Sequence, residues 1–356
     1  MKTRFLPGFF SSFREGNYKQ HLDKKRSAFL CMLEPLVSSA SLPEVFTSFV
    51  GKGFRTRAKY KIFQREGRLF VEGTDPLKGT VPYEEALWIL PPRGRKMVPQ
   101  IVAVLETEKR AFPVDGLEMR LSHGHRDVLV VLSVKKDIKK SFEPLVRLLL
   151  ESVKGLVGVV IPSQHKVIGE RALSHRILGC EISAPYDTFF QSHSVLTPRL
   201  IEVVIESFSQ ACNRGLLDLY CGVGLFSLFS AKFFSEIMGV DNSPSAVEYA
   251  RWNSKQWGLN NTYFIRSDVS GFLNKKTVES VDCLVVDPPR SGCSQGTVEK
   301  MLEIGAEYVC LVSCCPETFV RDLKIWLKNG YSVGAMSALD MFPFTDFLET
   351  VTLLRK

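Results

Sequence analysis

From about Phe189 to the C-terminus, short apolar segments alternate with segments of helical periodicity. GLLDLYCG, EIMGVD and VDCLVVDPP predict buried strands, and SAVEYARWNSKQWG and TFVRDLKIWLKNG predict helices between such strands. This alternation is typical of a doubly wound parallel sheet that is covered by helices. The last two strand-like segments, YSVGAMSALDMFP and LETVTLLRK, have no long helix between them, so we expect them to pair antiparallel.

The first half of the chain predicts an α+β fold. HLDKKRSAFLCMLEPLV has a helical pattern, FRTRAKYKIFQREGRLFVEG predicts a β-hairpin that turns at REGR, and LEMRLSHGHRDVLVVLSV predicts two more strands. PPRGRKMVPQ predicts a loop that precedes a helix. We therefore expect two domains, α+β in residues 1–185 and Rossmann-like α/β in residues 186–356, and 356 residues are enough for both.

Positive charge is concentrated near the N-terminus. The net charge is +8, and residues 1–70 hold 14 Lys and Arg against 5 Asp and Glu. Arg55, Arg57, Lys59 and Lys61 alternate along the first strand of the predicted hairpin, so all four share one face. A row of cations matches the charges of a nucleic-acid backbone. We favour RNA or DNA contact; the alternative is a strand edge that charge keeps soluble.

The composition limits the class of protein. Nine cysteines, an odd number without regular spacing, predict a reducing, cytoplasmic setting without disulfides. No signal-peptide core is present, and the longest apolar run contains Asp218 and turn glycines, so we expect no membrane span. His123 and His125 lack neighbouring cysteines or carboxylates and predict turn residues, so we expect no metal. Nothing in the sequence implies an obligate protein partner.

Several residues follow the predicted parallel strands at their carboxyl ends, where ligands bind in such sheets. Gly222 and Gly224 predict a tight turn that lets a ligand approach the backbone. Asp241 lies 19 residues after Gly222, close to the spacing of a carboxylate that binds ribose hydroxyls. The third glycine of a dinucleotide fingerprint is missing, which favours S-adenosylmethionine. Asp268 is either an adenine contact or a helix N-cap, and Asp287 precedes two prolines that stiffen its turn.

Cys314 and Cys315 are adjacent in LVSCCPETFVRDL. Neighbours on an extended strand point to opposite sides, so the pair is a poor chelator, and a disulfide between them would be strained. A nucleophile remains as the interpretation of Cys314, because it ends a strand at the same sheet edge as Asp287 and Gly222. We expect Cys315 to face the packing.

The motifs DLYCGVG, DPPRSG, SCCPETFVRDL and DMFPFTDFLETVTLL resemble those of the RNA uracil-C5 methyltransferase family, which makes 5-methyluridine in tRNA and ribosomal RNA. The resemblance covers the C-terminal half in order, and DTFFQSHSVLTPRL resembles the family's Phe-x-Gln segment. It implies a C-terminal S-adenosylmethionine-dependent methyltransferase domain and an N-terminal α+β domain that binds RNA.

The resemblance also implies roles for single residues. Uracil C5 is a poor nucleophile until a thiolate adds to C6, and a base must then remove the C5 proton. Cys314 matches the family's nucleophile and Glu349 its base. Arg290 is implied to touch the base or its phosphate, as Asp287 is. The implied cofactor ligands are Gln191, Tyr220, Asp241 and Asp287.

Some positions depart from the family. Cys315 stands where Asn is usual, and Phe344 and Phe347 stand where His is common. His193 replaces Asn, and Asp241 is shorter than the commoner Glu. Ala86 stands where some members carry an iron–sulfur ligand, and only Cys31 precedes it, so we expect no iron–sulfur cluster.

Three alternatives remain open. A cytosine-C5 RNA methyltransferase resembles Asp-Pro-Pro-Cys at the fourth strand, whereas here Arg290 follows the prolines and Cys293 lies beyond. An adenine-N6 enzyme favours an aromatic residue after Pro-Pro and needs no thiol. The third alternative is a non-catalytic RNA-binding protein with the same fold, against which an intact Cys314 and Glu349 argue.

Overall fold

The computed structural model describes residues 15–38, 42–47, 52–66, 68–75, 79–135, 138, 140–208, 214–275 and 281–356. They belong to two compact units, which we describe separately. The N-terminal unit comprises Val50–Asp187 and Gln191–Ser194, and the C-terminal unit comprises Ser11–Phe49, Thr188–Phe190 and Val195–Lys356. Among the helices of the described residues, none has the length and hydropathy that crossing a membrane requires.

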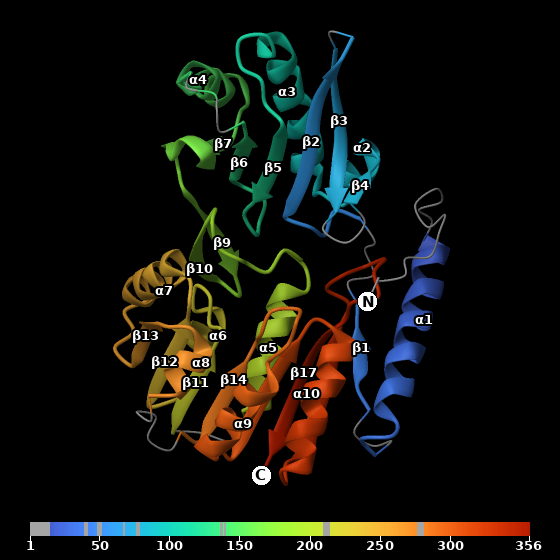
Figure 1. The fold of residues 1–356 in the computed structure, drawn as a ribbon, viewed down its shortest axis with the longest axis vertical. Coiled ribbons are helices and arrows are strands. Elements are labelled where there is room, and N and C mark those ends of the chain that lie inside the picture. The colour runs from blue at the N-terminus through green and yellow to red at the C-terminus, as the bar shows by residue number, and fades with distance from the viewer. Residues whose placement is uncertain are drawn as a thin grey trace. The chain divides into compact units, whose positions relative to one another are not determined.

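The C-terminal unit contains the predicted doubly wound sheet (Figure 1). Its eight strands lie in the order β1-β16-β17-β15-β14-β11-β12-β13. Strands β11, β12, β13, β14 and β15 are parallel to one another. The strands are β1 (Glu44–Phe46), β11 (Gly215–Leu219), β12 (Glu236–Asp241), β13 (Thr262–Arg266), β14 (Cys283–Val286), β15 (Tyr308–Ser313), β16 (Ser332–Leu339) and β17 (Glu349–Arg355). The helices are α1 (Glu15–Leu33), α5 (Thr197–Ser207), α6 (Leu225–Ser230), α7 (Pro244–Gln256), α8 (Val269–Leu273), α9 (Gln295–Ile304) and α10 (Pro316–Lys328).

The last two strands confirm the antiparallel prediction. β16 pairs antiparallel with β17, and β17 inserts between β16 and β15, so it is also antiparallel to β15. The register of the β15–β17 pair ends at Ser313 opposite Thr350. Because β17 runs against the parallel strands, its first residue lies at the edge where those strands end.

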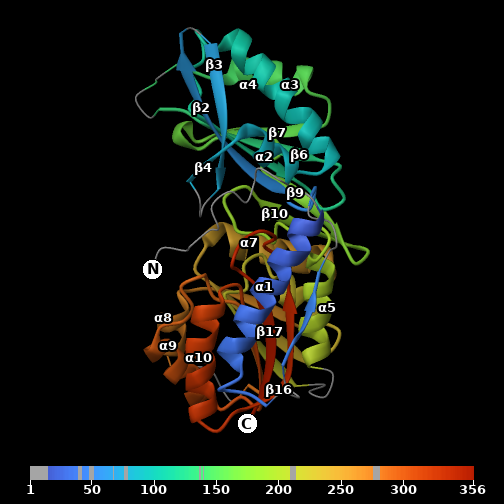
Figure 2. The same ribbon diagram turned by 90° about the vertical axis from the view of Figure 1, so that its right-hand side faces the viewer.

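The N-terminal helix belongs to the C-terminal unit, whereas we predicted that residues 1–185 form one domain. β1 pairs in parallel with β16, and the ring of Phe29 on α1 lies 6.1 Å from that of Phe319 on α10. Phe29 and Leu33 are buried in the core of this unit. Figure 2 shows α1 running beside α10. The predicted helix is confirmed, but its apolar face is covered by a sheet that follows much later in the sequence.

The N-terminal unit is built on a mixed seven-stranded sheet in the order β4-β3-β2-β5-β6-β7-β8, with a separate β9–β10 hairpin. The predicted hairpin is formed by β2 and β3, and the two later strands are β5 and β6. The strands are β2 (Arg57–Arg65), β3 (Arg68–Asp75), β4 (Gly79–Val81), β5 (Gly116–Leu121), β6 (Val128–Ser133), β7 (Leu156–Ile161), β8 (Lys166–Gly169), β9 (Ala172–Ile177) and β10 (Cys180–Pro185). The helices are α2 (Tyr83–Trp88), α3 (Pro92–Glu108), α4 (Glu143–Ser152) and the 3-10 helix η3 (Pro162–Gln164).

The prediction of a loop at PPRGRKMVPQ is wrong, because α3 begins within this segment at Pro92. Proline suits the first turn of a helix, where its missing N–H would have no partner. Met97, Val98 and Ile101 then form the buried face of the helix. Two prolines and a glycine therefore mark the start of this helix rather than an extended loop.

We expect Phe29→Ala to destabilise the C-terminal unit by about 3–5 kcal/mol, because it removes a fully buried ring. Hydrogen exchange read by mass spectrometry reports each unit separately. Exchange should accelerate in β15–β17 and stay unchanged in β5 and β6. Phe189→Ala, at a ring that is 68% exposed, is the matched control. Faster exchange confined to β5 and β6 would contradict this assignment of α1.

Candidate active site

The turn after β11 has the backbone of a ligand-binding loop. Tyr220, Gly222 and Gly224 all have positive φ, at 66°, 55° and 84°. A Cβ built on Gly224 would lie 3.0 Å from the Phe264 ring, so this glycine allows close packing. A Cβ on Gly222 would meet no atom within 4 Å, so open space adjoins that backbone. A left-handed tyrosine is uncommon and concentrates strain at this turn.

Asp241 ends β12 and is fastened to that turn. Its Oδ2 accepts a hydrogen bond from the Gly222 N–H at 3.0 Å, and its Oδ1 accepts one from the Ser243 N–H at 2.8 Å. Each carboxylate oxygen has further lone pairs, so both can still accept hydroxyl donors. The carboxylate is therefore held in one orientation beside the glycine turn, as binding of ribose hydroxyls requires.

Asp268 follows β13 and caps α8. Its two oxygens accept hydrogen bonds from the N–H groups of Ser270 and Gly271, at 3.0 and 2.9 Å. The N-cap interpretation is confirmed. An adenine contact by the same side chain stays a prediction.

Asp218 is a buried acid that our sequence reasoning did not single out. Its Oδ2 accepts hydrogen bonds from the hydroxyl and the N–H of Ser227, at 2.6 and 3.1 Å, whereas no described residue hydrogen-bonds its Oδ1. Burial raises the pKa of Asp218 to about 7. A lone acid inside the apolar run LLDLY was the available signal, because burying a charge without full compensation is costly.

Cys314 and Glu349 meet at the carboxyl edge of the sheet. Ser313 and Thr350 form the last pair of the β15–β17 ladder, so the residues just beyond them, Cys314 and Glu349, are neighbours across the two strands. Asp287 follows β14 at the same edge, where its N–H donates to the carbonyl of Leu219. Residues that the sequence separates are therefore brought together by strand order.

The charges at this edge interact. Burial raises the pKa of Glu349 well above its usual range, and Asp287 raises it further. Burial also raises the pKa of Asp287, to about 8, with a smaller contribution from Asp218. The pKa of the Cys314 thiol rises to about 12, first through burial and then through the charges of Glu349 and Asp287. Arg290 opposes these shifts at both Cys314 and Glu349.

Aromatic rings hold Arg290. Its guanidinium carbon lies 4.6 Å from the ring centre of Phe347 and 5.8 Å from that of Phe342, within the range of cation–π attraction. Phe344, in the same segment, has a φ of 63° and packs edge-on against Tyr18. Phe347, at one of the positions that depart from the family, thus contacts Arg290, the cation among the described residues that favours a Cys314 thiolate.

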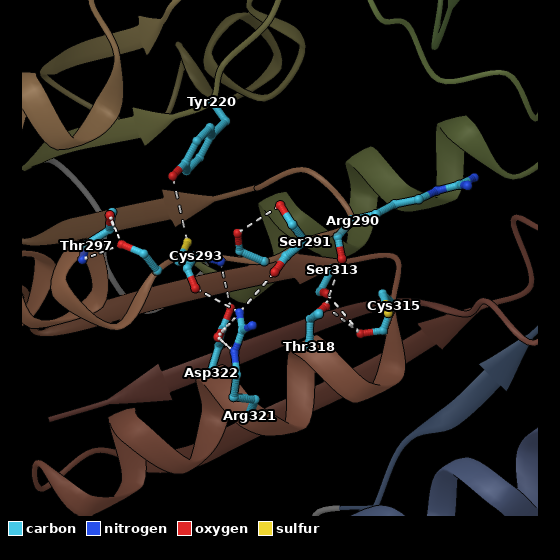
Figure 3. Close-up of polar contacts among 12 residues, drawn as sticks. Tyr220, Arg290, Ser291, Cys293, Thr297, Ser313, Cys315, Thr318, Arg321 and Asp322 are labelled. Atoms are coloured by element: carbon cyan, nitrogen blue, oxygen red, sulfur yellow. Dashed lines mark hydrogen bonds and ion pairs between the residues drawn. The ribbon is translucent and has the colours of Figure 1, made fainter. Parts of the chain in front are cut away.

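The loop that carries Arg290 is anchored to α10. Thr318 donates a hydrogen bond to the Arg290 carbonyl, and Arg321 donates to the carbonyls of Ser291 and Cys293. Asp322 accepts from the Cys293 N–H at 3.0 Å. Figure 3 shows these contacts and the Arg290 side chain extending away from them. The loop backbone is therefore fixed while the guanidinium remains exposed.

Two cysteines near the site have other surroundings. Cys315 is half-buried at the N-cap of α10, and its thiol donates to Glu317 at 3.2 Å. The expectation that Cys315 faces the packing is therefore wrong, because the chain turns into the helix at this residue. Cys293 is buried, with its sulfur 3.9 Å from the Tyr220 hydroxyl.

The remaining predicted site residues lie in the N-terminal unit. Gln191 belongs to that unit, so its contact with the cofactor stays a prediction. The alternation of the basic strand is confirmed, because Thr56, Ala58 and Tyr60 are buried between less buried basic residues. The sequence pattern did not show that an acid of β5 lies beside these cations. Glu118 forms ion pairs with Arg57, Lys59 and Arg120. These contacts outweigh its burial and lower the pKa of Glu118 to about 2.

The described residues form no cluster of metal ligands. No group of three or more His, Cys, Asp or Glu side chains that could hold a metal ion occurs there. His123 is more than a turn residue, since its Nδ1 lies 2.9 Å from that of His175 in a buried pair.

Comparison with known proteins shows the family of the chain. A family model described as tRNA (Uracil-5-)-methyltransferase matches residues 17–356. The chain is 29% identical to an uncharacterized RNA methyltransferase of Aquifex aeolicus, over 95% of this chain and 79% of that protein. It is 33% identical to an uncharacterized RNA methyltransferase of Caldanaerobacter subterraneus, over 67% of this chain and 56% of that protein. The chain spans about half the length of most of the curated relatives it matches.

A solved structure shares the fold. The crystal structure of the Pyrococcus abyssi tRNA (uracil-54, C5)-methyltransferase in complex with S-adenosyl-L-homocysteine matches with a TM-score of 0.74 at 22% identity. The match covers 95% of this chain and 83% of that chain. With the family model spanning nearly the whole sequence, the chain belongs to the tRNA (uracil-5-)-methyltransferase family, which confirms the family prediction.

We expect the free energy of unfolding of Asp218→Asn to rise relative to that of the wild type as pH rises from 4 to 7. The raised pKa means that folded Asp218 keeps its proton where the unfolded chain has lost it, so wild-type stability falls over this window. Asparagine has no such proton, and the change should be on the order of 2 kcal/mol. Urea unfolding at pH 5 and pH 8 measures it.

Asp282→Asn is the control for this measurement, because Asp282 forms a surface ion pair with Arg214. The free energy of unfolding of this variant, relative to that of the wild type, should not rise from pH 5 to pH 8. An Asp218→Asn difference that is the same at pH 5 and pH 8 would contradict the buried, protonated state of Asp218.

Proposed function

We propose that this member of the tRNA (uracil-5-)-methyltransferase family transfers a methyl group from S-adenosylmethionine to C5 of a uridine in tRNA or ribosomal RNA. The observation that carries the proposal is the juxtaposition of Cys314 and Glu349 beyond the last pair of the β15–β17 ladder. A thiol and a buried carboxyl group at one sheet edge are the two groups that this chemistry requires.

The residues at the neighbouring strand ends fit the cofactor. Asp241 suits the ribose hydroxyls, because backbone N–H groups already orient its carboxylate. Gly222 borders open space, and Tyr220 and Asp287 flank it from the ends of adjacent strands. Gln191 is proposed as a further ligand on the family resemblance alone. When bound, S-adenosylmethionine supplies an electrophilic methyl group.

Cys314 begins the reaction. Its thiolate adds to C6 of the uracil, the C5–C6 double bond opens, and C5 becomes nucleophilic towards the methyl group. Because the Cys314 thiol of the free protein has a raised pKa, it must release its proton to solvent when the uridine binds, before the sulfur can attack C6. Arg290 is the neighbouring cation that favours the thiolate, and its exposure leaves it able to contact the RNA as well.

Glu349 completes the reaction. Its carboxylate takes the proton from the methylated C5, the C5–C6 double bond forms again, and the bond from C6 to sulfur breaks to release the Cys314 thiolate. A carboxyl group with a raised pKa is the stronger base for this step once it has lost its own proton. The balance is one methyl group gained at C5 and one proton lost, and the donor would leave as the thioether S-adenosylhomocysteine. The reacting uridine must be unpaired or flipped out for its C6 to reach Cys314.

Trapping with 5-fluorouridine tests the reaction. Fluorine at C5 cannot leave as a proton, so the intermediate should persist as a covalent protein–RNA complex. Intact mass spectrometry of the protein with fluorouridine-substituted total RNA and S-adenosylmethionine should detect the adduct. Sequencing the trapped RNA would then distinguish tRNA from ribosomal RNA.

Three variants complete this experiment. Cys314→Ala should form no adduct, and Cys315→Ser should trap as wild type does. Glu349→Gln should accumulate an adduct with ordinary RNA, because glutamine cannot remove the C5 proton of the methylated uridine. Trapping that survives Cys314→Ala, or that fails with every RNA, would reject the proposed chemistry.

The exposed face of the β2–β3 hairpin is the proposed RNA surface. Glu118 already pairs with Arg57 and Lys59, so the cations nearer the hairpin tip are the better phosphate contacts. Within the described residues, no ion pair involves Lys61 or Arg65. The rings of Phe63 and Phe70 stack at 5.9 Å on this face, Arg65 lies 4.9 Å from the Phe63 ring, and Phe70 is 44% exposed. Aromatic rings between cations suit stacked bases and phosphates.

Replacing Lys61 and Arg65 together by Met should weaken binding to tRNA and lower the slope of log Kd against log salt by about two. Arg57→Met is the matched control and should change the slope less, because Glu118 already pairs with Arg57. Fluorescence anisotropy over a salt series measures both. Equal slopes for the double variant and wild type would exclude the hairpin tip as an RNA contact.

A further inference from the structure

A buried lysine links the N-terminal helix to the segment between β16 and β17. Lys25 is 7% exposed, and its Nζ donates to Asp340 Oδ1 at 2.5 Å and to the carbonyls of Phe342 and Phe347 at 3.0 and 2.9 Å. An ammonium has three N–H donors, and these acceptors satisfy all three. One side chain thus binds both ends of the segment 342–347.

Asp340 is held on its other side as well. The Tyr18 hydroxyl donates to Asp340 Oδ2 at 2.7 Å, and the Tyr18 ring packs edge-on against Phe344, 5.3 Å between centres. Asp340 is fully buried. Tyr18 and Lys25, about two turns apart on α1, therefore reach the same carboxylate and the same segment.

Apolar contacts also attach α1 to this unit. Phe29 and Leu33 already bury the apolar part of the helix in the core of the C-terminal unit. Burying an ion pair gains little stability compared with apolar residues of similar size, but it does impose one arrangement when all partners are satisfied. The lysine network is thus better suited to orienting the segment 342–347 than to holding the helix.

The oriented segment contacts the reacting groups. Phe342 and Phe347 flank the guanidinium of Arg290, and Glu349 follows two residues after Phe347. Phe344 keeps a left-handed backbone, which a bulky residue adopts only when its surroundings enforce it. The charge of Arg290 in turn acts on Cys314 and on Glu349.

We propose that Lys25 is a positioning residue: it holds the segment 342–347 so that its rings keep Arg290 beside Cys314 and Glu349. The role of Lys25 in methylation rests on the proposed function. Its effect on Arg290 and on the Cys314 thiol does not, so the two can be tested separately.

In the absence of RNA, the reactivity of Cys314 reports whether Arg290 is in position. Four groups act on this thiol, namely Glu349, Asp287, Arg290 and Cys315, and Arg290 is the one that favours the thiolate. We would measure the iodoacetamide alkylation rate of Cys314 in the full chain from pH 7 to 10, with Cys315→Ser as the background. Peptide mass spectrometry identifies the modified residue.

The test variant is Lys25→Met with Asp340→Asn, which leaves no unpaired buried charge. Its alkylation curve should shift to higher pH, and a shift of one pKa unit slows the reaction about tenfold at a given pH below the midpoint. Arg290→Met should cause the same shift, and combining it with the test variant should add nothing. Lys24→Met, at the exposed neighbouring lysine, is the matched control and should follow the background curve.

A folded test variant whose curve coincides with that of Lys24→Met overturns the proposal, even if its melting temperature is lower. If the buried Cys283 and Cys310 also become reactive, the test variant has unfolded. Lys25→Gln then replaces it, and its alkylation curve is compared with that of Lys24→Met in the same way. With RNA, the test variant should lower kcat and leave KM for RNA unchanged. If the wild type methylates no RNA, the proposed function fails, and the alkylation curves still decide the role of Lys25.

Discussion

The insertion of β17 between β15 and β16 is the constraint on which the candidate site depends. A strand that runs against its parallel neighbours begins where they end, so Glu349 opens β17 beside Cys314 at the end of β15. The hydrogen bonds of two ladders hold this strand in register. A shift of one residue would turn Glu349 to the other face of the sheet.

Burial determines the chemistry of the groups that this arrangement brings together. Three carboxyl groups, those of Asp218, Asp287 and Glu349, have raised pKa values. The side chains of Asp218 and Glu349 are buried, whereas Asp287 is half-buried and also lies near the charge of Asp218. The same burial disfavours a thiolate at Cys314. A single exposed cation, Arg290, opposes this effect, which makes its position important for the whole cluster.

The positions of Arg290 and of the RNA surface both depend on residues from distant parts of the chain. Arg290 is flanked by rings whose segment is bound by Lys25 of the N-terminal helix. On β2, the row of cations is confirmed as a pattern, but Glu118 of β5 neutralises part of it. In both places the contacting residues come from another element, so the local sequence carried no signal of them.

The sequence by itself determined the alternation of strands and helices, the antiparallel last pair, the basic alternation and the family, because period, turn residues and motifs are local properties. It also predicted that Cys314, Asp287 and Gly222 share one sheet edge. It failed for α1, which joined the other unit through distant contacts. It also failed at two helix starts, because α3 began inside a predicted loop and Cys315 stands at the N-cap of α10 rather than in the packing. Only the tertiary structure decided that Asp218 is buried, that Glu349 adjoins Cys314, and that Lys25 binds the segment beside Arg290, because burial and charge pairing arise only when distant segments pack.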